Sequence, residues 1–167
     1  MTGVQTCALP IYQKYRKQWE NTPYPVIFQT VDSVVIQSGH VLMVKRKSEP
    51  GKGLWALPGG FLDANKDKSV LDCAIRELKE ETGIKVPVPV LRGNIVTTKV
   101  FDDPHRSSRG RTITHASLIH LPADVTLPKV KGSDDAKVAK WWPLADIKRE
   151  ILFEDHKDII DHLTAML

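Results

Sequence analysis

The chain has 167 residues, of which 41% are hydrophobic and 26% are charged, and its formal net charge is +4. This length and composition predict one globular domain with an ordinary core, and the absence of any apolar run of about 18 residues excludes a membrane-spanning helix. The modest positive charge suits an anionic substrate without indicating nucleic-acid binding, and two cysteines are too few for a disulfide framework or a zinc site, which predicts a cytoplasmic protein.

The first 25 residues differ in character from the rest of the chain. Residues 1–11 lack the basic start and the long apolar core of a signal peptide. They resemble a translated sequencing-adapter artefact; if they are one, the natural chain has been cut here and an upstream domain could be missing. Residues 12–25 are charged, end in prolines and are predicted to be a linker, so residues 1–25 form a non-native leader plus linker and residues 26–167 the domain.

The domain is predicted to begin with a β-hairpin. Residues 26–37 and 41–46 are rich in β-branched and apolar side chains, and a Ser-Gly-His sequence separates them. A Pro58-Gly59-Gly60 turn follows. Its two glycines allow backbone to approach a ligand or a helix closely, which a side chain would prevent.

A helix is predicted over residues 69–82. Ser69 and Asp72 approximate a capping box at its start, and Gly83 is a suitable residue to end it. The apolar residues of the helix, among them Ile75 and Leu78, form one stripe that we expect to be buried.

The opposite face of this helix carries three carboxylates. Glu77, Glu80 and Glu81 are spaced i, i+3 and i+4, so they share an arc of roughly 100° and repel one another. A cation that compensates this repulsion would be Mg²⁺ or Mn²⁺, which prefer carboxylate, water and phosphate ligands. The alternative is a solvated acidic helix face.

The remainder of the chain is predicted to mix strands with helices. The predicted strands are 86–100, 111–121 and 138–142, and the predicted helices are 146–151 and 156–167. The polar loop 102–110 contains a basic cluster, Arg106, Arg109 and Arg111, which is either a grip on phosphate or a solvated loop. Asp134 and Asp135 lie in another predicted loop, where turn formation is the simpler explanation.

The glycine, arginine and glutamates together resemble the Nudix hydrolase box, G-x5-E-x7-R-E-U-x-E-E-x-G-U, in which U is a bulky apolar residue. The second half of the box is matched residue by residue, and its opening glycine is matched by Gly60. The matching residues of the second half are Arg76, Glu77, Leu78, Glu80, Glu81, Gly83 and Ile84. The middle departs from the pattern: Gly60 and Arg76 are 16 positions apart, two more than in the family, and the first Glu is missing. Asp67 or Asp63 could replace its contact with the arginine.

The wider sequence, from about Tyr12 to the C-terminus, is similar to the Nudix half of bacterial proteins that join nicotinamide-mononucleotide adenylyltransferase to ADP-ribose pyrophosphatase. Segments 24–35, 51–61 and 109–116 carry this similarity. The resemblance implies an α/β/α sandwich with a mixed sheet, a role in NAD metabolism, a nucleotide substrate and a homodimer. It implies neither a nucleic-acid nor a membrane partner.

The resemblance also implies the reaction and the site. ADP-ribose would be hydrolysed to AMP and ribose 5-phosphate, with Mg²⁺ (or Mn²⁺) bridging Glu77, Glu80 and Glu81 to the diphosphate. Arg76 would orient Glu77, and the substrate would contact a further set of residues. This set is Gly59, Gly60, Arg106 and Arg111. The alternatives are another nucleoside-diphosphate-linked substrate and a non-catalytic ADP-ribose sensor.

Overall fold

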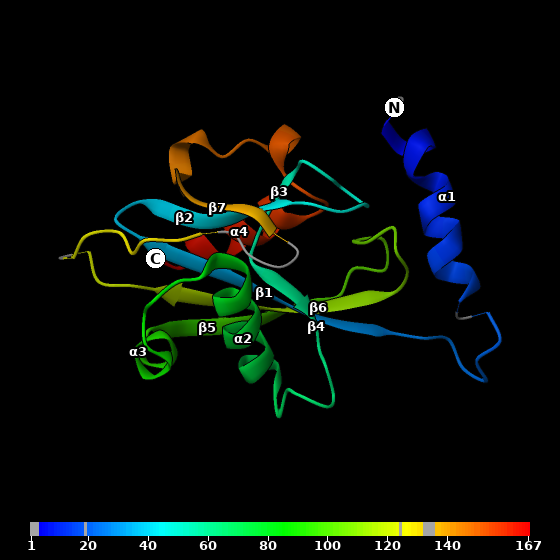
Figure 1. Ribbon diagram of the computed structural model, residues 1–167, viewed down its shortest axis with the longest axis horizontal. Coiled ribbons are helices and arrows are strands. Elements are labelled where there is room, and N and C mark those ends of the chain that lie inside the picture. The colour runs from blue at the N-terminus through cyan, green and yellow to red at the C-terminus, as the bar shows by residue number, and fades with distance from the viewer. Residues whose placement is uncertain (1–3, 19, 124, 132–135) are drawn as a thin grey trace.

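The computed structural model describes residues 4–18, 20–123, 125–131 and 136–167 (Figure 1). The first three residues of the predicted leader lie outside this part, as do Trp19 of the predicted linker and the loop residues Asp134 and Asp135. The elements in chain order are α1 (Val4–Lys17), β1 (Phe28–Gln37), β2 (His40–Arg46), β3 (Trp55–Ala56), β4 (Gly59–Phe61), α2 (Val70–Thr82), α3 (Val88–Gly93), β5 (Ile95–Phe101), β6 (Thr112–His120), β7 (Ala136–Pro143) and α4 (His156–Thr164), with 3₁₀ turns at Leu144–Asp146 and Arg149–Ile151.

The strands form one mixed sheet, as predicted. Its main order is β3-β2-β1-β6-β5, with β4 paired to β1 and β7 paired to β2. Strands β1 and β6 run parallel, from Phe28 opposite Thr112 to Ile36 opposite His120, and the other pairs are antiparallel. β1 therefore lies in the middle of the sheet, where it is buried on both faces.

The two faces of β1 pack against two different helices. Val34 and Ile36 pack with Ile159 of α4, whereas Val35 packs in a second cluster with Leu78 of α2. Alternation of side chains along a strand produces this division. Figure 1 shows α2 in front of the sheet and α4 behind it, which confirms the predicted α/β/α sandwich.

The hairpin and the central helix form as predicted. Ser38 and Gly39 both have positive φ angles, 47° and 71°, which suits the tight turn between β1 and β2. Ser69 caps α2 by accepting a hydrogen bond from the Asp72 N–H at 3.1 Å. Gly83 ends α2 in the left-handed conformation and donates its N–H to the Lys79 carbonyl.

Three sequence expectations differ from the structure. Residues 86–100 were predicted as one strand, but Pro87 and Pro89 start the short helix α3, which buries Leu91 before β5 begins. The predicted helix over 146–151 is two 3₁₀ turns. The described part of the leader and linker contains the helix α1.

Within the part of the chain that the structure describes, every helix is too short or too polar to cross a lipid bilayer.

Candidate active site

A cleft of about 630 Å³ lies beside the segment that contains β3 and β4 and beside the acidic face of α2. One side is formed by the segment 56–64, which includes Gly59 and Gly60, and by α2. The end of β2 and the start of the loop after it contribute basic residues, among them Arg46, and Arg109 comes from the loop between β5 and β6. Acidic and basic side chains therefore line the same space.

Asp67 holds the arginine of α2. The Arg76 guanidinium donates two hydrogen bonds of 2.7 Å to the Asp67 carboxylate, whose side chain is only 1% exposed. These bonds hold the pKa of Asp67 far below its usual value. Asp67, rather than Asp63, thus occupies the place of the missing glutamate, and the two extra residues of the loop are accommodated.

Arg76 in turn orients two of the glutamates. Its Nη1 donates to Glu77 at 2.8 Å and to Glu80 at 3.0 Å. The predicted role of Arg76 toward Glu77 therefore has the geometry of a charge-assisted hydrogen bond, which is shorter and stronger than a neutral one.

Glu77 and Glu81 line the cleft, and both are half-buried. Burial raises the pKa of Glu81 to about 8, although the N–H of Gly59 donates to its Oε2 at 2.9 Å and partly offsets the effect. Burial also raises the pKa of Glu77, against the opposing effect of Arg76. Two partly desolvated carboxylates at one cleft wall are costly without a cation, because proteins neutralise or pair such groups.

Glu80 is placed differently from the other two glutamates. Its side chain is 47% exposed and is bonded to Arg76. Among the described residues, no three acidic, histidine or cysteine side chains converge as a ready metal site. The structure thus brings Glu77 and Glu81 to the cleft and leaves Glu80 beside it.

The residues present fit a divalent cation at Glu77 and Glu81. The donors are hard carboxylate oxygens, and burial raises the pKa values of both groups, so each would gain from a nearby positive charge. Mg²⁺ commonly uses one or two protein carboxylates, with the remaining ligands supplied by water and substrate phosphate. Two glutamates are therefore a sufficient protein contribution.

The two glycines are required by close approach. A Cβ on Gly60 would lie 2.7 Å from the Glu77 carboxyl carbon, and a Cβ on Gly59 would lie 2.0 Å from the Val31 carbonyl oxygen. Gly60 therefore leaves room for a side chain of the site, and Gly59 for the pairing of β4 with β1. Both glycines also line the cleft, as the sequence predicts.

The basic loop distributes its arginines in three directions. Arg106 is 4% exposed and donates two 2.9 Å hydrogen bonds to Asp155, while Arg111 is directed to the Asp102 carbonyl. Arg109 lines the cleft, and its guanidinium lies 5.1 Å from the Phe61 ring centre. The sequence predicts Arg109 as a member of the basic cluster but not as one of the residues that contact the substrate.

Arg46 is a further cleft residue that the sequence analysis did not single out. Its guanidinium lies 4.1 Å from the Phe153 ring centre, and its Nε donates to the Pro50 carbonyl at 2.9 Å. Its position at the end of a predicted strand carries no distinctive signal, since basic residues end many strands.

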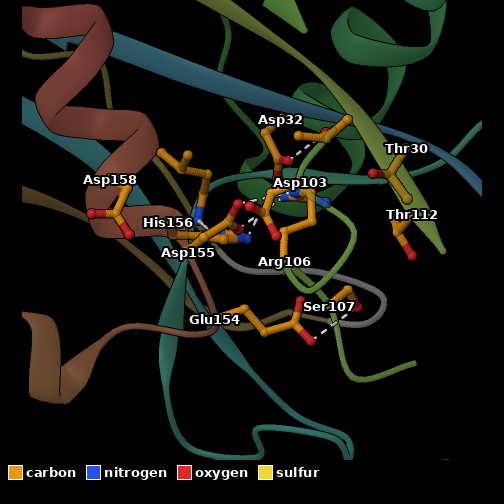
Figure 2. A network of polar contacts seen from close by, with 12 residues as sticks. Thr30, Asp32, Asp103, Arg106, Ser107, Thr112, Glu154, Asp155, His156 and Asp158 are labelled. Atoms are coloured by element: carbon orange, nitrogen blue, oxygen red, sulfur yellow. Dashed lines mark hydrogen bonds and ion pairs between the residues drawn. The ribbon is translucent and has the colours of Figure 1, made fainter. Parts of the chain in front are cut away.

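A buried polar network lies behind the Gly59 turn (Figure 2). Figure 2 shows Asp32 of β1, Arg106, Asp155 and His156 directed toward one another. Asp32, Arg106, Glu154 and His156 are among the residues that line a small cavity of about 40 Å³ at this place. Burial raises the pKa of Asp32 to about 7 and lowers that of His156 to about 3.

His156 is the first residue of the helix predicted over 156–167, and the sequence assigns it no further role. Asp32 could have been recognised from the sequence as a candidate functional residue, because it is a lone carboxylate within an apolar strand that would be buried on both faces. His156 and Arg106 offered no such signal, since their partners lie in distant parts of the chain.

The sequence was compared with known proteins. The chain matches the NUDIX domain family over residues 28–163. It is 34% identical over 133 residues to an ADP-ribose pyrophosphatase of Methanocaldococcus jannaschii, covering 80% of this chain and 71% of that protein. It is also 30% identical over 161 residues to the ADPR-responsive transcriptional repressor NtrR of Acinetobacter baylyi, covering 93% of this chain and 60% of that one.

A solved structure matches over nearly the whole chain. It is the bifunctional NMN adenylyltransferase/ADP ribose pyrophosphatase of Francisella tularensis, crystallised with AMP and a manganese ion, with 41% identity and a TM-score of 0.90. The match covers 96% of this chain and 47% of that one, so this chain spans about half the length of that relative.

Proposed function

Because the chain belongs to the Nudix family and is a Nudix hydrolase, we propose that its substrate is ADP-ribose and that its products are AMP and ribose 5-phosphate. One observation carries the proposal: two half-buried glutamates and three arginines, Arg46, Arg76 and Arg109, line a single cleft of about 630 Å³. That volume is within the usual range for a small-molecule site, roughly 300–1,000 Å³.

The acidic wall is the reactive side. Nudix hydrolases use divalent metal ions, which supply positive charge against a diphosphate and lower the pKa of nearby water. Glu77 and Glu81 would hold such an ion, magnesium in the first instance and manganese as the alternative. Glu80 would join them only by giving up its hydrogen bond to Arg76.

The basic wall binds the substrate. Arg46 and Arg109 line the cleft and would contact diphosphate oxygens, for which a planar guanidinium is well suited. Arg76 has a different task, because Asp67 and Glu77 already occupy its donors. It fixes the Glu77 carboxylate at the cleft, so that little reorganisation is needed during the reaction.

Arg106 and Arg111, which the resemblance places in contact with the substrate, are not proposed to contact the diphosphate. Neither of them is among the residues that line the main cleft: Arg106 lines the small cavity behind the turn and is bonded to Asp155, and Arg111 donates to the Asp102 carbonyl. Arg46 and Arg109 are therefore the arginines that would contact the diphosphate.

A binding role without catalysis is the second candidate. The similarity to an ADPR-responsive repressor, 30% over 161 residues, favours it. In this chain, however, all three glutamates of the second half of the box are present, and Glu77 and Glu81 line the cleft as half-buried side chains. This arrangement favours hydrolysis.

A product assay tests the proposal. The purified chain would be offered ADP-ribose, NADH, a diadenosine polyphosphate and 8-oxo-dGTP in parallel, with Mg²⁺ and with Mn²⁺. We expect AMP and ribose 5-phosphate to form fastest from ADP-ribose and to disappear when a chelator is added. Faster cleavage of another compound would overturn the substrate, and ADP-ribose binding without turnover of any compound would establish the sensor.

A further inference from the structure

The ring nitrogens of His156 have distinct partners beneath the active-site turn. The N–H of Leu57 donates to His156 Nδ1 at 2.8 Å, and both groups are buried. An imidazole nitrogen that accepts a hydrogen bond carries no proton, so the proton of the neutral ring lies on Nε2. Burial and three nearby arginines, which lower the pKa of His156 to about 3, keep the ring neutral.

Asp32 lies on the other side of the ring. His156 Nε2 lies 3.8 Å from Asp32 Oδ1, and the Thr114 hydroxyl donates to Asp32 Oδ2 at 2.6 Å. Asp32 also pairs with Gly59 between β1 and β4. The imidazole therefore lies between a central strand and the turn, and its Nδ1 accepts the Leu57 N–H.

The turn that His156 holds is also the turn that holds Glu81. Only Pro58 separates Leu57 from Gly59, and the Gly59 N–H donates to Glu81 Oε2 at 2.9 Å. The Pro58 carbonyl accepts the Ser33 N–H at 2.8 Å and anchors the turn on the side of β1. Two hydrogen bonds, joined by the covalent backbone from Leu57 to Gly59, thus connect α4 to the carboxylate at the cleft.

We propose that His156 is a positioning residue for this hydrolase: its Nδ1 sets the Leu57–Gly59 backbone, and through it the place of the Glu81 carboxylate. The ring does not line the main cleft, so it acts through the turn rather than on the substrate. The inference rests on the proposed function for its kinetic test, but it makes a structural claim that can be tested without substrate.

Two replacements of His156 distinguish the effect of its hydrogen-bond acceptor from the effect of filling its space in the core. His156→Asn keeps an oxygen at the position of Nδ1, whereas His156→Leu leaves the buried Leu57 N–H without an acceptor. The matched control is Leu163→Ala, a buried α4 residue that can neither donate nor accept a hydrogen bond through its side chain. All three variants would be assayed below their melting temperatures, with activity expressed per folded molecule.

We expect His156→Leu to lower kcat roughly 10- to 100-fold with little change in KM, because a displaced Glu81 impairs the reaction more than binding. His156→Asn should recover most of the loss, and Leu163→Ala should lower the melting temperature while keeping kcat. Equal kcat values for the Asn and Leu variants would overturn the proposal, as would an equal loss in Leu163→Ala.

Hydrogen–deuterium exchange supplies the readout that needs no substrate. In the metal-free protein, the Leu57 and Gly59 amides should exchange about tenfold faster or more in His156→Leu, from the loss of one buried hydrogen bond, and near the wild-type rate in His156→Asn. Unchanged exchange in His156→Leu would overturn the positioning role. A wild-type chain that failed to cleave ADP-ribose would overturn the proposed function only, since the exchange result would still decide this inference.

Discussion

The two carboxylates that line the cleft, Glu77 and Glu81, lose part of their hydration in the folded protein, which disfavours their charged forms. Glu81 has one backbone hydrogen bond, and burial nevertheless raises its pKa to about 8. A residue selected for stability alone would be apolar at this position, because replacing a buried charge by a well-packed apolar group is often stabilising. The retained carboxylate therefore suggests a chemical role.

The first prediction concerns the charge of Glu81. Glu81→Gln keeps the size of the side chain and an oxygen to accept the Gly59 N–H, but it removes the negative charge. We expect the variant to fold and kcat to fall by at least about 100-fold, since even residues around metal ligands typically contribute 10–100-fold. Steady-state kinetics with ADP-ribose measures this, and preserved turnover in a well-folded variant would refute the assignment of Glu81.

The second prediction concerns the space beside Glu77. A methyl group in Gly60→Ala would lie 2.7–2.8 Å from the Glu77 carboxylate, and the flexible side chain would move away from it. We therefore expect a small loss of stability and a fall in kcat of about 100-fold, the effect of a displacement near 1 Å.

Gly93→Ala is the matched control for that change. A Cβ at Gly93 would meet no heavy atom within 4 Å, and the residue ends α3 without a positive φ angle. Melting curves and kinetics should both stay close to wild type. If Gly60→Ala behaves in the same way as Gly93→Ala, the close approach has no functional value.

At the scale of elements, the loop between β4 and α2 shows how a contact can be kept when a motif changes. The loop is two residues longer than the family box and lacks its first glutamate. Asp67 nevertheless reaches Arg76 with two 2.7 Å bonds, and the Asp63 N–H donates to Asp67 at 2.9 Å. The aspartate side chain is shorter than the glutamate of the family box, and the loop, held by this bond between Asp63 and Asp67, brings Asp67 within reach of Arg76.

The third prediction tests this replacement. Asp67→Asn retains one acceptor for Arg76 but loses the charge and the second strong hydrogen bond. We expect kcat to fall roughly 10–100-fold with a smaller change in KM, as for other residues that orient a metal ligand. Asp161→Asn is the control, because it breaks an exposed ion pair with Lys157 on α4 and should leave kinetics unchanged.

The sequence predicts those elements whose signal is local. The helix over 69–82 has an apolar stripe, a cap and a terminal glycine, and the β1–β2 hairpin has two β-branched runs about a glycine turn. β3 and β4 have only two and three residues, too few to show a periodicity. α3 was missed because its valines favour a strand, while its two prolines suit the first turn of a helix.

The site divides in the same way. Arg76, Gly60 and the glutamates could be singled out from the sequence because they stand in one short stretch that resembles the Nudix box. The contributions of Arg46, Arg109 and His156 depend on pairings that no local pattern encodes. Tertiary packing alone brings them to the turn.

At the scale of the whole molecule, several buried acids share one region, and this sets the dependence of stability on pH. The pKa values of Asp32 and Glu81 are raised from 3.8 and 4.5 to about 7 and about 8. Both groups bind protons more tightly in the folded state, so their contribution to stability is complete below the unfolded values and is lost as the pH rises through the folded ones. His156 has the opposite effect, because its pKa is lowered, but that effect is confined to pH values below about 6.5.

The fourth prediction follows for the metal-free protein. Its melting temperature should fall as the pH is raised from about 7 to about 8.5, a range in which the carboxylates lose protons in the folded state and His156 is neutral in the folded state and mostly neutral in the unfolded state. Differential scanning fluorimetry with chelator measures the slope. Glu81→Gln should show a shallower slope, and saturating Mg²⁺ should restore stability at the alkaline end by binding the ionised form. A melting temperature that rose over this range would contradict the cause given for both pKa values.

The hydrogen bond between Leu57 and His156 joins residues 99 positions apart, and that between Thr114 and Asp32 joins residues 82 positions apart. The Nudix box, by contrast, occupies residues 60–84 without interruption. Contacts so distant in sequence form late, because the intervening chain must first be ordered. During synthesis, a growing chain would carry the whole box long before α4 emerged to fix the turn beside it. The activity of this protein should therefore appear only near the end of its folding, after its most recognisable sequence has already been made.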